Sequence, residues 1–293
     1  MMKHALRIAV RPAGRGDRRL IEALLVAARW RHQHLDWENS LDLLHRQPFL
    51  LAIDSGSLRA CLACPEDPPG IAWLRLFAVH RDHGASGPWE LLWEEARRIL
   101  GVRTGTAVAL TQQSWMRTLL EGSGFRETNA VLFLERRGPP PETIRPGNVD
   151  VRPLRPDDLE DVLAIDQRAF TPLWQHSRSA LEAALALADL STVAVDANLR
   201  PVGYALGTFS ALGGHLARLA VEPAHQRRGV GAVLTTDALR RFHERGVPTV
   251  SVNTQADNHR GRALYGKLGF RETGQAFPVF ELDLQEDPAS EAP

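Results

Sequence analysis

The 293-residue sequence has few of the residue types that mark several classes of protein. Its two cysteines, Cys61 and Cys64, are too few for the disulfide framework of a small secreted domain. Lysine occurs only at Lys3 and Lys267, so arginine supplies nearly all of the positive charge. Lys plus Arg and Asp plus Glu each total 35, and this balance gives no basic field for nucleic acid or anionic lipid.

Long apolar segments are also missing. No stretch reaches the roughly 20 apolar residues of a membrane-spanning helix, and residues 1–10 lack the apolar core of a signal peptide. We therefore expect a soluble, cytoplasmic protein that binds neither membrane nor nucleic acid. Its length is long for one domain and comfortable for two.

The Cys-x-x-Cys spacing of Cys61 and Cys64 is found in redox pairs and in half-sites for zinc. A structural zinc site needs four ligands, and no second cysteine pair or histidine cluster accompanies this one. A redox pair normally lies at a helix N-terminus, whereas these cysteines lie in a strand-like run before Pro65. We expect structural cysteines and no bound metal.

Two segments of the sequence recur. Val-Arg-Pro at 10–12 returns at 151–153, and Gly-Phe-Arg-Glu-Thr at 124–128 returns at 269–273. Offsets of 141 and 145 residues indicate a tandem duplication rather than a short-period repeat.

The duplication predicts the domain organisation of the chain. We expect an N-terminal domain over 1–137, a stiff proline-rich linker over 138–148, a C-terminal domain over 149–284 and a disordered polar tail over 285–293.

The run from Leu219 to Gly231 is the most informative part of the sequence. An apolar strand ends at Val221, and apolar residues at i, i+4 spacing predict a helix from Val230 to about Arg245. A glycine-containing loop between a strand and a helix exposes backbone N–H groups at the positive end of the helix dipole, which suits a pyrophosphate.

This run resembles the acetyl-CoA signature, Gln/Arg-x-x-Gly-x-Gly/Ala, of the GNAT superfamily of N-acetyltransferases. Asn258, seven residues before Tyr265 in a helix that closes with Leu-Gly-Phe, resembles the family's second signature. The resemblance covers roughly residues 149–284. It implies an α/β (α+β) fold of two tandem GNAT-like domains, each with a mixed, mostly antiparallel central sheet flanked by helices.

The resemblance also implies an activity and a set of site residues. The chain would transfer acetyl from acetyl-CoA, a co-substrate, directly to a primary amine, and Tyr265 would protonate the departing thiolate. The alternative for Tyr265 is a buried core tyrosine, and for Arg227 and Arg228 a solvated basic corner. The implied cofactor-binding residues are Leu219, Ala220, Val221, Gln226, Arg227, Arg228, Gly229, Val230, Gly231, Ala232 and Asn258. Asn258 either orients the cofactor or caps the helix that follows it.

The general base does not follow from the resemblance. Many relatives carry a glutamate five positions before the asparagine, where this chain has Asn253. His215 ranks first among the remaining candidates because the two-residue alternation along a strand places it on the same face as Leu219 and Val221. The other candidates are Glu222, His225, Asp257 and His259.

The N-terminal copy departs from both signatures. Trp89 stands where the C-terminal copy has Gly231, and Pro88 removes an N–H donor from the same loop. Leu120 replaces the tyrosine, and Gln113 replaces the asparagine. We expect this copy to keep the fold and to have lost the cofactor.

Alternatives remain open at the level of function. A non-catalytic acyl-CoA-binding module would keep the phosphate loop, although it would have no need of Tyr265. The aromatic cluster of Phe170, Trp174 and His176 is either a wall of the substrate pocket or domain-interface packing. The acceptor is either a small molecule or a peptide amine, and the protein is either a monomer or a homodimer.

Overall fold

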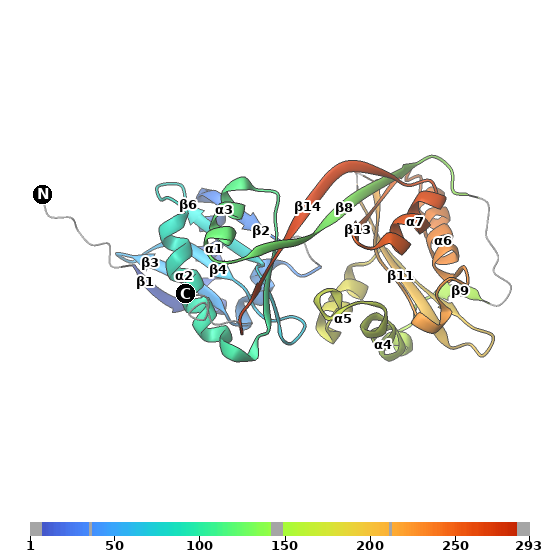
Figure 1. The fold of residues 1–293 in the computed structure, drawn as a ribbon, viewed down its shortest axis with the longest axis horizontal. Coiled ribbons are helices and arrows are strands. Elements are labelled where there is room, and N and C mark those ends of the chain that lie inside the picture. Colours follow the sequence, from blue (N-terminus) through green and yellow to red (C-terminus); the bar gives the residue numbers. More distant parts are fainter. Residues whose placement is uncertain (1–7, 35–36, 142–148, 211–212, 286–293) are drawn as a thin grey trace, which may run out of the picture. The chain divides into compact units, whose positions relative to one another are not determined.

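The computed structural model describes residues 8–34, 37–141, 149–210 and 213–285 (Figure 1). The chain divides into two compact units, each with its own core. The N-terminal unit comprises Met1–Thr128 and Pro278–Pro293, and the C-terminal unit comprises Asn129–Phe277. The predicted linker residues 142–148 and the tail residues 286–293 lie outside the described residues.

The N-terminal unit contains a sheet in the order β1-β3-β4-β6-β2 and a second set of paired strands, β5-β7-β14. Its strands are β1 (Ala9–Pro12), β2 (Ala28–Gln33), β3 (Phe49–Asp54), β4 (Ser57–Ala63), β5 (Ile71–Trp73), β6 (Leu76–His80) and β7 (Thr106–Leu110). Its helices are α1 (Arg18–Ala27), α2 (Ser86–Leu100) and α3 (Ser114–Gly122), with short 3-10 turns η1 (Arg15–Asp17), η2 (Ser40–His45) and η3 (Gly101–Arg103).

The C-terminal unit contains a mixed sheet in the order β14-β8-β13-β12-β11-β10-β9. Its strands are β8 (Arg126–Arg137), β9 (Asp150–Pro153), β10 (Leu190–Val195), β11 (Pro201–Ser210), β12 (Gly213–Val221), β13 (Thr249–Gln255) and β14 (Arg271–Asp283). Its helices are α4 (Leu159–Ala169), α5 (Arg178–Leu187), α6 (Val230–Glu244) and α7 (His259–Lys267), with 3-10 turns η4 (Pro156–Asp158), η5 (Pro172–Trp174) and η6 (Pro223–His225). The mixed α/β architecture with helices on both faces of the sheet confirms the predicted fold class (Figure 1).

Equivalent hydrogen bonds occur at the start of both copies. Arg11 donates to both carboxylate oxygens of Asp17 at 2.6 and 2.8 Å, and Arg152 does the same to Asp158 at 2.7 Å. In each copy the carboxylate also accepts the backbone N–H three residues earlier, which closes the turn that leads into the helix. The arginine hydrogen bond lowers the pKa of Asp17 to about 2, and the equivalent bond also lowers the pKa of Asp158. The duplication is therefore visible in side-chain chemistry as well as in sequence.

The last strands of the two copies are exchanged. β8 leaves the N-terminal unit and pairs along β13, from Val131 opposite Gln255 to Arg137 opposite Thr249. β14 leaves the C-terminal unit and pairs with β7 over residues 279–283. The compact units therefore do not follow the boundaries at 137 and 149 drawn from the sequence, because those boundaries follow chain order and the final strands do not.

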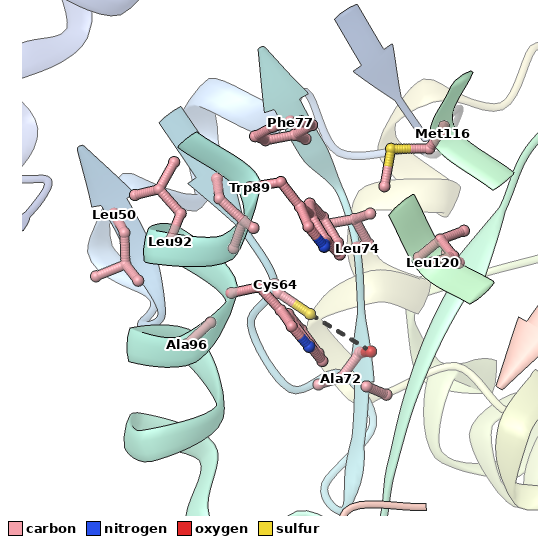
Figure 2. Close-up of a cluster of buried hydrophobic side chains, with 14 of the residues drawn as sticks. Leu50, Cys64, Ala72, Leu74, Phe77, Trp89, Leu92, Ala96, Met116 and Leu120 are labelled. Atoms are coloured by element: carbon pink, nitrogen blue, oxygen red, sulfur yellow. Dashed lines mark hydrogen bonds between the residues drawn. The ribbon is translucent and has the colours of Figure 1, made fainter. Parts of the chain in front are cut away.

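The cysteines lie in the core of the N-terminal unit, together with the tryptophan of the altered loop. Cys61 and Cys64 are free and fully buried, and the Sγ of Cys64 lies 3.7 Å from the carbonyl oxygen of Ala72 (Figure 2). Burial raises the pKa of Cys61 to about 12 and that of Cys64 in the same direction, which disfavours the thiolate that redox chemistry and metal binding require. Trp89 is 2% exposed and packs in the same cluster as Cys64, edge-on to Phe77 (Figure 2), whereas Cys61 belongs to a separate cluster of the same unit.

No helix in the described part of the chain combines the length and the apolar character needed to cross a membrane.

Candidate functional site

Two neighbouring strands of the C-terminal unit separate after a short paired segment. β12 and β13 run parallel, and between the described residues their pairing extends from Gly214 opposite Val250 to Leu216 opposite Val252. β12 continues to Val221, and beyond Leu216 its described pairing is with β11 alone. The strands thus form a V in which the described pairing leaves one edge of β12 beyond Leu216 without a partner strand, so that an extended ligand can hydrogen-bond there. At the end of this edge, Nε2 of Gln226 donates to the carbonyl oxygen of Val221 at 3.1 Å.

The loop at the open end of this V leads into helix α6. Arg227 and Gly229 both have positive φ, 61° and 87°, and Gly229 occupies the N-cap position of the helix. Among the described residues, no side chain caps this N-terminus. Consecutive backbone N–H groups in such a left-handed turn, followed by the start of a 15-residue helix, suit an anion.

The V and this loop border a cavity of about 650 Å³. The cavity brings together ten of the twelve predicted site residues. Among the two others, Val230 is 1% exposed and packs in the core, and Arg228 is exposed outside the cavity lining. The lining residues are Ala169, Phe170, Leu219, Ala220, Val221, Gln226, Arg227, Gly229, Gly231, Ala232, Asn258, Arg260, Gly261, Ala263, Leu264, Tyr265 and Lys267.

Helix α7 contributes residues that the sequence analysis missed. Arg260 and Lys267 add positive charge to the cavity lining, and Nη1 of Arg260 donates to Oε1 of Gln226 at 3.2 Å. Arg260, Ala263, Leu264 and Lys267 follow one another at i, i+3, i+4 and i+7, the spacing of residues that share one face of a helix.

Asn258 has a structural role at the start of α7. Its Oδ1 accepts the backbone N–H of Gly261 at 2.9 Å, and its Nδ2 donates to Oγ1 of Thr254 at 2.9 Å. A Cβ at position 261 would lie 2.5 Å from that Nδ2, so the cap requires a glycine there. Asn258 both caps the helix and lines the cavity, so the two alternatives for this residue are compatible.

Tyr265 lies in the cavity wall and is 6% exposed. Its ring packs edge-on against Phe270, with centroids 5.6 Å apart. Burial raises the pKa of the phenol above its ordinary value, so the group stays protonated at neutral pH. Tyr265 is therefore a packed tyrosine and also a cavity-lining residue whose phenol is protonated at neutral pH.

A β-bulge changes which side chains of β12 share a face. Arg218 pairs with Leu206 and Leu216 with Gly207, so Ala217 is an extra residue. His215, opposite Thr208, consequently lies on the same face of the sheet as Arg218, and Leu219 and Val221 lie on the other face. The parity argument that ranked His215 first is wrong, because the alternation was counted through a bulge that the sequence does not reveal.

The two faces carry different helices (Figure 1). Phe242 of α6 lies against Gly207 and Gly214 on one face, which we call the α6 face. Asp166 of α4 bonds to Arg218 on the opposite face, which we call the α4 face. His215 belongs to the α4 face.

His215 has a defined hydrogen-bond arrangement. Its Nδ1 lies 2.9 Å from Oγ of Ser251, and that hydroxyl donates to the carbonyl oxygen of Gly214 at 3.2 Å. The serine oxygen therefore accepts Nδ1–H, which leaves Nε2 of His215 as an acceptor. Burial lowers the pKa of His215, so the neutral ring dominates at neutral pH.

The other candidate bases are less well placed. Both carboxylate oxygens of Glu222 accept hydrogen bonds from Arg168 at 2.7–3.0 Å. Asp257 and His259 are exposed, and His225 lies outside the cavity lining. His215 also lies outside the cavity lining, and we rank it first because its half-buried ring is neutral and the hydrogen bond at Nδ1 leaves Nε2 as an acceptor.

A buried ion pair supports the cavity wall from the α4 face. Asp166 is 0% exposed and accepts two hydrogen bonds from Arg218 at 2.8–2.9 Å and one from the hydroxyl of Tyr204. The Arg218 guanidinium lies 3.7 Å from the ring centroid of Phe170, which lines the cavity.

The same pair holds the rest of the aromatic cluster. Arg218 donates to the carbonyl oxygen of Trp174 at 2.7 Å, and Asp166 accepts the backbone N–H of His176 at 2.8 Å. The segment from Phe170 to His176 is thus fixed to the sheet, with Phe170 as its contribution to the cavity.

In the N-terminal copy a strand of the same chain, β2, occupies the position that corresponds to the V. β2 pairs with β6, Trp30 opposite Val79 and Arg31 opposite Ala78, on the edge of β6 away from β4. In the repeat, Ala78 and Val79 correspond to the residues of β12 that line the cavity. Nε2 of Gln113 donates to the carbonyl oxygen of Arg31 at 3.0 Å, and so holds the inserted strand.

Comparison with known proteins agrees with this geometry. Residues 159–270 match the model of the Acetyltransferase (GNAT) family. Mycothiol acetyltransferase of Nocardioides sp. (strain ATCC BAA-499 / JS614) is 28% identical over 178 residues, which are 52% of this chain and 60% of the relative. Ribosomal protein bS18-alanine N-acetyltransferase of Escherichia coli (strain K12) is 39% identical over 57 residues, which are 20% of this chain and 38% of the relative. The matched segments span less than two thirds of either relative.

A tandem GNAT protein from the clavulanic acid biosynthesis pathway, solved without acetyl-CoA, superposes with a TM-score of 0.66 at 15% identity. The superposition covers 96% of this chain and 100% of that one, which shows a shared tandem fold. The chain is therefore a tandem GNAT-fold protein whose C-terminal copy belongs to the GNAT acetyltransferase family.

Proposed function

We propose that the C-terminal copy binds acetyl-CoA and transfers its acetyl group to a primary amine. The V between β12 and β13, which ends in the uncapped, positively charged start of α6, is the observation that carries this proposal. The pyrophosphate lies at the loop of Arg227 and Gly229, and the pantetheine arm pairs with β12 from Val221 toward Leu219. The thioester then lies near the closed end of the V, where Leu216 pairs with Val252.

Two side chains move protons in this proposal. Nε2 of His215, next to the closed end of the V, takes a proton from the ammonium form of the acceptor, and the neutral amine nitrogen attacks the thioester carbon directly. The attacking nitrogen then loses its second proton to solvent. The C–S bond then breaks, and Tyr265 gives its proton to the thiolate of CoA. Asn253, where relatives carry a glutamate, has no part in proton transfer.

The N-terminal copy binds no cofactor in this account. β2 occupies the edge of β6 that would pair with pantetheine, and Trp89 fills the start of α2. The names of the relatives are consistent with an amine acceptor, either small or on a protein, without identifying the one used here.

A turnover screen tests the proposal. Purified full-length protein is incubated with acetyl-CoA and a panel of amines that includes small amines and peptides with free N-termini, and released CoA thiol is measured. Amine-dependent release of thiol supports acetyl transfer. Tight acetyl-CoA binding with no release from any amine would favour the alternative, a non-catalytic acyl-CoA-binding module.

A further inference from the structure

The exchanged strand β8 brings residues of the N-terminal copy to the α4 face beside the closed end of the V. Glu135 lies directly opposite Ser251, and Phe133 lies opposite Asn253. Since Ser251 lies opposite His215 on β12, His215, Ser251 and Glu135 form a row across three adjacent strands.

The other residues of β8 point to the opposite face. Leu134 pairs with Val252 in the core on the α6 face, and Arg136 bonds to the carbonyl oxygen of Leu268 at the end of α7. The alternation along β8 therefore assigns Phe133 and Glu135 to the face that carries His215.

This part of the α4 face combines an aromatic surface with a carboxylate. Phe133 packs against Phe277 with ring centroids 4.9 Å apart, and both side chains are half-buried. The Glu135 side chain is 44% exposed and has only a loose ion pair, 3.7 Å, with Arg137. Asn253, which lies opposite Phe133, is exposed.

We infer that this surface binds the acceptor, and that the acceptor is a protonated primary amine attached to an apolar or aromatic group. This inference rests on the proposed function, because the acetyl group at the closed end of the V defines where the amine must arrive. The carboxylate of Glu135 attracts the ammonium group toward the His215–Ser251 pair, and the Phe133–Phe277 pair contacts the apolar part. The N-terminal copy thus supplies specificity-determining residues to the other copy.

Glu127 offers a matched control for Glu135. It is on the same strand but in the N-terminal unit, its side chain is 48% exposed, and it pairs with Arg117 at 3.5 Å. The substitutions Glu135→Gln and Glu127→Gln therefore remove the same charge from similarly exposed positions.

The experiment measures phenethylamine binding to the full chain saturated with CoA, by calorimetry, with ethanolamine as the amine that lacks an apolar group. We expect phenethylamine to bind more tightly than ethanolamine, and Glu135→Gln to weaken phenethylamine about two- to fivefold, as expected for a partly exposed ion pair. Phe133→Ala should weaken phenethylamine about two- to tenfold and ethanolamine less. Glu127→Gln should change neither amine, and the CoA affinity should be the same in all variants.

Equal effects of the two glutamate substitutions, or no preference for phenethylamine, would overturn the inference. Circular dichroism melting of each variant separates lost binding from lost folding. The turnover screen tests the proposed function independently of this surface. If Glu135→Gln acetylates amines with an unchanged KM, the acetyl transfer is supported and the role of this surface is rejected.

Discussion

The buried pair of Asp166 and Arg218 gives the sharpest prediction for stability. Asp166→Asn keeps the size of the side chain and removes its charge, which leaves the Arg218 guanidinium, 11% exposed, without a counter-ion. Breaking one side of a buried ion pair costs about 3–5 kcal/mol in the free energy of unfolding. For a unit of this size, about 2–4 °C is lost per kcal/mol, so Tm should fall by about 6–20 °C.

A double substitution tests the physical reason for this loss. Asp166→Leu with Arg218→Met removes both charges and fills the space with apolar groups, and such replacements are often neutral. We expect the double variant to melt well above Asp166→Asn, measured by calorimetry and by urea denaturation followed with circular dichroism. A loss below about 1 kcal/mol in Asp166→Asn, or a double variant no more stable than the single one, would refute the reasoning.

Three further substitutions test the site. Tyr265→Phe should lower kcat by about 10²–10⁴-fold and leave the acetyl-CoA Kd unchanged, and full kcat would reject the tyrosine as the acid. In the native protein kcat/KM should decline on the acid side with a midpoint below pH 6.5, because burial lowers the pKa of His215 and only its neutral form accepts a proton. This decline should be absent in His215→Gln. Gly231→Trp should abolish acetyl-CoA binding, because a Cβ there already lies 3.2 Å from Leu264 and an indole would fill the cavity; Gly266→Ala, where a Cβ meets open space, should bind normally.

Local chemistry made much of the C-terminal copy predictable from the sequence. Residue type and spacing located the strand ending at Val221, the helix starting at Val230 and the cap at Asn258, because each depends on neighbours in the chain. The same local chemistry operates at the start of α5, where the hydroxyl of Ser177 caps the helix by accepting the N–H of Ala180 at 3.1 Å.

Features that depend on distant pairing were not predictable in the same way. The bulge at Ala217 reverses the faces of β12, and it is set by register against β11 rather than by residue type. The exchange of β8 and β14 follows from pairing with strands more than 100 residues away. The insertion of β2 beside β6 likewise left no motif in the sequence.

The number of acetyl-CoA molecules bound per chain tests the central claim most directly. The claim is that the V in the C-terminal copy is open to the cofactor, whereas β2 and Trp89 fill the corresponding space in the N-terminal copy. Calorimetric titration of the full chain with acetyl-CoA should give a stoichiometry near one, and the single site should disappear in Gly231→Trp. A stoichiometry near two, or binding that survives Gly231→Trp at native affinity, would contradict the account.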